Sequence, residues 1–260
     1  MKKSDKKFPN VIVCFKELGE TPLDAIKTLK QAVPGLEDIP VTYAGRLDPM
    51  AEGILLLLLG DEVNNKEDYL KLDKEYTFEV LFGFSTDTYD VLGKITDTED
   101  GVLTETLLET AIQGLIGTYA QTYPPYSSKK VAGKPLFRWA RESRLHEIEL
   151  PSHTVTVHSL SFDKLETISA PELKKEIARN LERVSGDFRQ RECKELWEAY
   201  IDNSMLEDFQ IATFRMKASG GTYVRALVHD LEERLGIPAT TFYIRRDAVG
   251  DYTKSVEGGE

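Results

Sequence analysis

The residue with the clearest chemical potential is Asp48, which lies within residues 43–60 (YAGRLDPMAEGILLLLLG). Pro49 disfavours helical backbone at the residue before it, so the Asp48 carboxylate is expected on an extended or turn backbone. Gly45 and Gly53 bound this loop, and an apolar run follows it. A carboxylate presented in this way can act as a nucleophile. The alternative is that Asp48 caps a helix beginning at Pro49, and the residues alone do not decide between the two.

The composition is that of an ordinary globular protein. The chain has 260 residues, 41% of them hydrophobic and 30% charged, which suits one large domain or a domain with a substantial insertion. No apolar run reaches the roughly 20 residues that span a membrane. The first ten residues, MKKSDKKFPN, carry lysines without a following apolar core, so we expect a charged leader on a cytoplasmic protein. Cys14 and Cys193 have no metal-binding spacing and are expected to be reduced.

The net charge of −11 favours a metabolic enzyme over a nucleic-acid binder, because RNA affinity comes largely from neutralised phosphates. The charge is uneven, however. Residues 127–146 hold a basic excess against the single acid Glu142: Lys129, Lys130, Lys134, Arg138, Arg141 and Arg144. This segment is expected either to contact a phosphate backbone or to be a solvated basic helix face.

The apolar patterns predict an α+β fold with a mixed, largely antiparallel sheet flanked by helices, because strands and helices do not alternate as βαβ units. Strands are expected at 11–15, 75–84, 209–216 and 240–244, with another beginning at 155, and the run at 54–59 is assigned to the core. Helices are expected at 21–33, 104–115 and 223–235. A charged helical hairpin at 171–206, within an insertion of about 165–207, separates two strands.

Four blocks, in the same order along the chain, resemble the TruB family of tRNA pseudouridine synthases. The first is the G-x-L-D-P-x-A-x-G catalytic loop around Asp48. The others are the K-x-Y strand with a T-D-T-x-D segment at 74–95, the P-P-x-Y-S block at 121–141, and the G-T-Y-x-R helix start with an R-R strand at 218–252. Four blocks in register across some 210 residues are far more specific than any one of them.

The resemblance implies a pseudouridine synthase fold, with a catalytic domain at 1–252 and a loose tail at 253–260. It also implies isomerisation of uridine 55 in the tRNA T loop, which must first be flipped out of its stack. Asp48 matches the nucleophile, and Arg225 matches an arginine that ion-pairs with it. Tyr76 matches a tyrosine that stacks on the base and assists proton removal from C5; without the resemblance it would be assigned to the core.

Further residues match substrate-binding positions of the family: Tyr43, Tyr223, Ile244, Lys16 and Lys130. The chain also departs from the family pattern. Tyr43 stands where the family has a histidine and cannot become cationic near neutral pH.

Arg46 replaces a small residue, and Glu17 follows Lys16 where the family has proline. The sequence stops soon after Arg246, which suggests a short form without the C-terminal RNA-binding (PUA-type) domain. The insertion would then replace some of its contacts or enlarge a family insertion.

Neither cofactor nor metal is expected, because the four histidines form no metal constellation and SGGTY at 219–223 lacks the P-loop lysine. The expected partner is the T arm of tRNA, bound by a monomer. Three alternatives remain open: a pseudouridine synthase acting on another RNA, an RNA chaperone that does not need Asp48, and a metabolic enzyme that binds no RNA.

Overall fold

The computed structural model describes residues 8–99, 101 and 103–253. The main sheet contains β1 (Val11–Lys16), β2 (Val41–Ala44), β3 (Ala51–Leu59), β4 (Lys74–Phe82), β7 (Gly117–Thr122), β10 (Ser152–Ser169), β11 (Asp208–Ala218), β12 (Ala239–Val249) and β13 (Tyr252–Thr253). Two short ribbons pair β5 (Phe84–Thr86) with β6 (Ile95–Thr98), and β8 (Lys130–Val131) with β9 (Lys134–Pro135). Residues 1–7 of the predicted leader (1–10) and residues 254–260 of the predicted tail (253–260) lie outside the described residues, whereas Thr253 belongs to β13.

The helices are α1 (Pro22–Ala32), α2 (Lys66–Lys71), α3 (Glu105–Gln113), α4 (Leu136–Arg141), α5 (Ala170–Arg183), α6 (Gln190–Asn203) and α7 (Val224–Leu235). Two short 3-10 turns, Gly60–Asn65 and Leu145–Glu147, complete the elements. Helix α1 begins where the sequence predicted. The Thr21 side chain accepts a hydrogen bond from the Asp24 backbone, and the Thr21 backbone N–H donates to the Asp24 side chain, which together form a capping box. None of the helices in the described ranges is long and apolar enough to cross a membrane.

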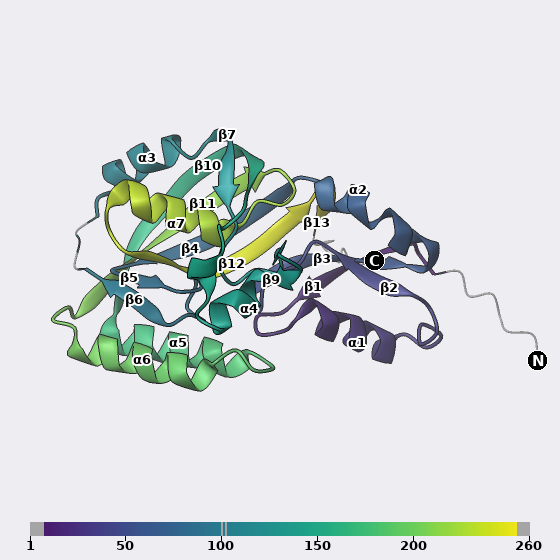
Figure 1. Ribbon diagram of the computed structural model, residues 1–260, viewed down its shortest axis with the longest axis horizontal. Coiled ribbons are helices and arrows are strands. Elements are labelled where there is room, and N and C mark those ends of the chain that lie inside the picture. The colour runs from purple at the N-terminus through teal and green to yellow at the C-terminus, as the bar shows by residue number, and fades with distance from the viewer. Residues whose placement is uncertain (1–7, 100, 102, 254–260) are drawn as a thin grey trace, which may run out of the picture.

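The strand order of the main sheet is β1-β3-β12-β4-β11-β10-β7, with β2 beside β3 and β13 beside β12 (Figure 1). Strands β12 and β3 pair in parallel, whereas the other ladders of this sheet are antiparallel. The predicted α+β fold with a mixed, largely antiparallel sheet is therefore confirmed. The prediction for the last strand was too short: β12 continues to Val249, and β13 follows it.

The two faces of the sheet are covered by different helices. On β4 the side chains of Phe78 and Val80 face the core under α3 and α7, whereas Leu81 faces the opposite cluster formed with α5 and α6. Strand β3 explains the continuous apolar run, because Leu55 packs into the cluster under α1 and Leu56 packs into a separate cluster on the other face. A strand buried on both faces has no need of alternating polar residues.

The predicted helical hairpin is present as α5 and α6, which lie together below the sheet in Figure 1. Strand β10 runs on to Ser169, so the helices begin directly at residue 170. Trp197 of α6 is 1% exposed; its indole lies 5.0 Å from the Phe84 ring, and its Nε1–H donates to the Val91 carbonyl at 3.0 Å. The hairpin is thus packed into the domain rather than appended to it.

We predict that Trp197→Ala lowers the free energy of unfolding by about 3–5 kcal/mol, because it leaves a large cavity in the cluster beneath the sheet. Tyr200→Ala on the same helix is the matched control; its side chain is 43% exposed, and we expect a change within about 0.5 kcal/mol. Urea denaturation followed by circular dichroism gives both values. Equal losses for the two variants would mean that α6 is not packed as described.

Candidate active site

Asp48 lies in the loop between β2 and β3 and does not cap a helix. The chain enters β3 at Ala51, so the helix-cap alternative is wrong. The side chain is 27% exposed, and its Oδ2 atom lies 2.7 Å from Nη2 and 2.9 Å from Nε of Arg225. The predicted contact between the carboxylate and the arginine is therefore present, although 177 residues separate them in the sequence.

Arg225, near the start of α7, is only 3% exposed. Besides Asp48, its Nη1 donates to the Thr88 carbonyl at 2.7 Å and its Nη2 to the Tyr126 carbonyl at 3.3 Å. Asp90 Oδ2 lies 3.6 Å from its Nε. Burial alone would lower the pKa of Arg225, but the Asp48 and Asp90 carboxylates outweigh it and raise the pKa. The guanidinium therefore stays charged, with its donors distributed among three segments of the chain.

A second buried arginine holds the loop that carries Asp48. Arg246 of β12 is 2% exposed, and its guanidinium donates to the carbonyls of Ile54 (2.7 Å), Gly45 (3.2 Å) and Arg46 (3.3 Å). Gly53 has φ +116, and a Cβ atom there would lie 2.2 Å from the Arg246 carbonyl oxygen. Only glycine permits this approach of β3 to β12, so the backbone on both sides of Asp48 is fixed to β12.

A cavity of about 620 Å³ opens beside Asp48, within the ~300–1,000 Å³ typical of small-ligand sites. Tyr76, Tyr223 and Ile244 line it together with Asp48 and Arg225. Burial raises the pKa of the Tyr76 phenol, which is 8% exposed, and raises the pKa of Tyr223 to about 12 with a further contribution from Asp48. Both rings are neutral phenols at physiological pH.

Tyr76 fits both descriptions given from the sequence. It packs in the core cluster with Phe78, and it also lines the cavity. Core and site are therefore not alternatives at this position.

Three of the predicted site residues lie away from the cavity wall. Lys16 is fully buried, and its Nζ donates to the carbonyls of Glu17 (2.9 Å) and Glu20 (2.8 Å), so it holds the turn after β1. Lys130 is exposed on β8. Tyr43 lies one step back from the cavity: its hydroxyl accepts from Arg46 at 3.2 Å, and Lys66 lies 4.8 Å above its ring.

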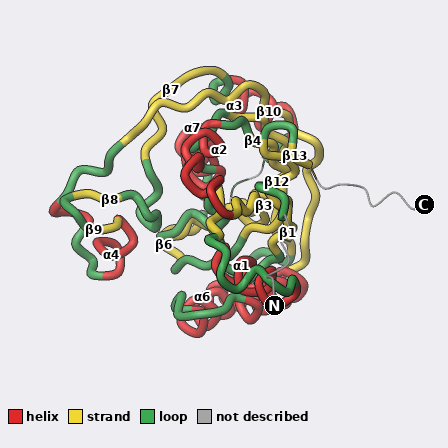
Figure 2. Tube along the Cα trace, turned by 90° about the vertical axis from the view of Figure 1, so that its right-hand side faces the viewer, coloured by secondary structure: helices red, strands yellow, loops and turns green. Residues whose placement is uncertain are grey.

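The basic segment, residues 127–146, contains two short paired strands followed by a helix. Strands β8 and β9 with helix α4 stand out from the body, as Figure 2 shows, and we call residues 123–147 the arm. Three of its cations lie over aromatic rings: Lys129 is 4.8 Å from the centre of the Tyr123 ring, and Lys134 and Arg144 are 4.3 Å and 5.2 Å from the centre of the Trp139 ring. A cation in this position is attracted to the negative face of the ring.

Other residues at the site carried no predicted role. Asp90 and Arg246 fall inside the T-D-T-x-D and R-R blocks, so the signal was present in the motifs that surround them. Phe188 and Arg189 also line the cavity, and nothing in the hairpin's sequence pattern indicated this. Within the described ranges no group of His, Cys, Asp and Glu side chains is arranged to hold a metal ion.

The fold has counterparts among solved structures. A chain in the crystal structure of a Cbf5-Nop10-Gar1 complex matches with a TM-score of 0.58 and 16% identity, covering 98% of this chain and 56% of that one. A chain in the structure of an H/ACA RNP bound to a substrate RNA containing 2′-deoxyuridine matches with a TM-score of 0.56 and 16% identity, covering 94% and 49%. These likenesses show that the chain shares its fold with those two chains.

Sequence comparison gives the family. Residues 36–178 match the TruB family pseudouridylate synthase (N terminal domain). The chain belongs to the TruB family.

Curated relatives agree with this assignment. The tRNA pseudouridine synthase B of Syntrophus aciditrophicus (strain SB) is 32% identical over 244 residues, covering 94% of this chain and 63% of that protein. The tRNA pseudouridine synthase B of Caldanaerobacter subterraneus subsp. tengcongensis is 31% identical over 243 residues, covering 93% and 69%. The chain thus spans about two thirds of the length of the curated relatives it matches, and 63% of the first.

We predict that Arg225→Met lowers the free energy of unfolding at pH 7 by about 3–5 kcal/mol, because it leaves the Asp90 carboxylate buried without a cation. Adding Asp90→Asn should recover part of the loss. Arg234→Met on the same helix is the control, since Arg234 is exposed. Urea denaturation of the four proteins measures the effect. A variant Arg225→Met as stable as the parent would show that this guanidinium does not balance the buried carboxylates.

Proposed function

We propose that this protein isomerises uridine to pseudouridine in RNA, with Asp48 as the nucleophile. The observation that carries the proposal is the Asp48 carboxylate at the wall of a 620 Å³ cavity, paired with the buried guanidinium of Arg225. Two contacts to one guanidinium fix the orientation of this carboxylate, which a nucleophile requires. Membership of the TruB family supports the same reaction.

The chemistry needs no group from outside the chain. The bond between N1 of uracil and C1′ of ribose breaks, the base turns, and a bond forms between C5 and C1′. The C5 proton then leaves, and N1 gains a proton, so atoms balance. Attack by Asp48 on the base or on C1′ would divide this exchange into easier steps.

The remaining cavity residues suit a base removed from its stack. Tyr76 and Tyr223 offer aromatic surface, and Ile244 offers apolar contact at the same wall. Stacking on a protein ring can offset the few kcal/mol that base flipping costs. We assign Tyr76 to stacking on the base, since its ring is held by strand β4; a part in proton removal at C5 rests on the family resemblance alone.

The substrate we propose is uridine 55 in the T loop of tRNA. The relatives named tRNA pseudouridine synthase B support a tRNA substrate. The arm supports contact with an RNA backbone, because its exposed cations include Lys130 and Arg138 while the chain as a whole carries a charge of −11. The acidic remainder of the surface would repel RNA elsewhere and restrict docking to the arm.

We predict that the intact protein releases tritium from C5-labelled uridine in a transcribed tRNA and that Asp48→Asn releases none, because the amide is not a nucleophile. The matched substrate control replaces uridine 55 with cytidine, and release should fall to background. Filter binding should show that Asp48→Asn still binds the tRNA. Release by Asp48→Asn would exclude the proposed nucleophile, and release from the cytidine-55 tRNA would move the target to another uridine. Refolding of RNA without release from either protein would favour a chaperone.

A separate prediction concerns the arm. Lys130→Ala combined with Arg138→Ala should raise KM for tRNA and leave kcat unchanged, because these cations contact the RNA backbone and not the reacting base. The slope of log Kd against log salt should fall by about 0.9 for each phosphate that the variant no longer neutralises. Lys175→Ala and Arg179→Ala, two cations on α5, serve as the control pair. An unchanged KM and salt slope would contradict the role of the arm.

A further inference from the structure

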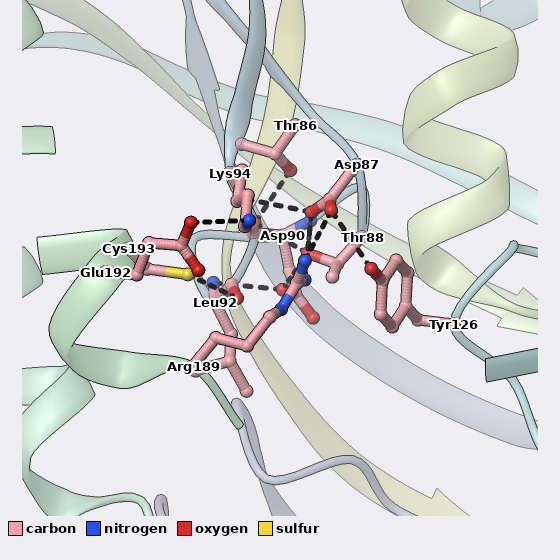
Figure 3. Close-up of polar contacts among 10 residues, drawn as sticks. All are labelled: Thr86, Asp87, Thr88, Asp90, Leu92, Lys94, Tyr126, Arg189, Glu192 and Cys193. Carbon is pink, nitrogen blue, oxygen red and sulfur yellow. Dashed lines mark hydrogen bonds and ion pairs between the residues drawn. The ribbon is translucent and has the colours of Figure 1, made fainter. Parts of the chain in front are cut away.

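The loop that joins the two helices of the inserted hairpin reaches the cavity. Arg189, its last residue, places its guanidinium against the Asp87 carboxylate through two hydrogen bonds, Nη1 to Oδ2 at 2.7 Å and Nη2 to Oδ1 at 3.1 Å. The same guanidinium lies 4.5 Å from the centre of the Tyr126 ring. The Tyr126 hydroxyl in turn donates to Asp87 Oδ2 at 3.1 Å, so the three side chains form a closed triangle (Figure 3).

These three side chains adjoin the two backbone carbonyls that accept hydrogen bonds from Arg225. Thr88, the residue after Asp87, supplies the carbonyl that accepts from Nη1 of Arg225. Tyr126 supplies the carbonyl that accepts from Nη2. Arg189 therefore joins by its side chain the two segments whose backbone orients the arginine paired with Asp48.

The hairpin also contacts the other side of the nucleophile loop. The backbone N–H of Ser185 donates to the Gly19 carbonyl at 3.2 Å, and the N–H of Gly19 donates to the Pro49 carbonyl at 2.8 Å. The approach is close, because a Cβ atom at Gly19 would lie 2.3 Å from the carbonyl oxygen of Arg183. Gly19 therefore links the hairpin loop by hydrogen bonds to Pro49, the neighbour of Asp48.

The hairpin has several contacts with the rest of the domain besides those of Arg189. Its apolar side chains and the Trp197 hydrogen bond already pack α5 and α6 against the domain, and Lys94 pairs with Glu192 at 2.6 Å beside them (Figure 3). Arg189 itself has φ +64, a left-handed conformation that favours glycine over a long side chain. The backbone conformation therefore gives no reason for an arginine here, whereas the contacts of its side chain do.

We propose that the inserted hairpin completes the active site and that Arg189 is a positioning residue, which fixes Asp87 and Tyr126 so that Arg225 holds Asp48 in the reactive orientation. This inference rests on the function proposed above. It assigns to the hairpin a role in the rate of the chemical step. RNA affinity should depend on other residues, because the exposed cations Lys130 and Arg138 belong to the arm.

The test is the single-turnover rate of tritium release at saturating enzyme, with the Kd for tRNA measured in parallel. We expect Arg189→Ala to slow the step by at least about tenfold, since small displacements of reacting groups cost rates of this order, with Kd unchanged within about threefold. Arg191→Ala is the matched control, because Arg191 lies two residues away with its side chain 92% exposed. It should react at the parental rate.

Two further variants separate positioning from folding. Asp87→Asn should slow the step as Arg189→Ala does, and the double variant should be no slower than either, because both remove the same ion pair. Added guanidinium at millimolar concentration should restore part of the rate of Arg189→Ala and none of the rate of Asp48→Asn. If Arg189→Ala does not fold, Arg189→Lys replaces it; one ammonium cannot reproduce the two-point contact with Asp87, so a rate below the parental value is still expected.

The outcomes distinguish the two proposals. If the parental protein releases tritium and Arg189→Ala releases it at the same rate, the positioning role is overturned and the proposed isomerase activity stands. A raised Kd with an unaltered rate would overturn it in favour of an RNA contact. Absence of release from the parental protein on tRNA and on ribosomal RNA would overturn the isomerase, and the positioning role with it.

Discussion

The charge of Arg225 is the constraint on which the rest of the site depends. A guanidinium that is 3% exposed has lost its water and must be balanced by carboxylates and carbonyls of the chain. Asp48 and Asp90 supply the negative charge, and Thr88 and Tyr126 supply neutral acceptors. All of these groups line the cavity, and Asp48 is the more exposed of the two carboxylates, at 27% against 7% for Asp90. The stabilisation of a buried cation is therefore also what orients the carboxylate that we propose as the nucleophile.

This arrangement requires a rigid frame, which the sheet provides. Arg225 comes from α7, whose apolar face packs on the sheet core, and Asp48 comes from a loop whose two ends are bonded to Arg246 of β12. The parallel pairing of β12 with β3 brings Arg246 opposite Gly53. The cation lies on a helix, and the carboxylate lies on a loop that is hydrogen-bonded to a strand. Both side chains are therefore restricted in position.

The sequence alone predicted the fold class, the helical hairpin and the contact between Asp48 and Arg225. The first two follow from periodicity, since Leu173, Ile177 and Leu181 recur at helical spacing. The third came from motif resemblance, because no local pattern relates residues 177 positions apart. Periodicity gave no sign of the role of Arg189, whose partners Asp87 and Tyr126 are distant in sequence. Lys16, for which a substrate-binding role was expected, is buried, and its Nζ donates to the carbonyls of Glu17 and Glu20; the motif alone did not indicate these contacts.

The order of the strands has a consequence for biosynthesis. Strand β12 lies between β3 and β4, although the ribosome makes it long after both. Until it emerges, each of these strands has an open edge, and the loop that carries Asp48 lacks the hydrogen bonds of Arg246. Pairings so distant along the chain form slowly, and open edges invite association with other chains. The loop that carries Asp48 is therefore fixed late in synthesis, after β3 and β4 have each been left with an edge that can associate with another chain.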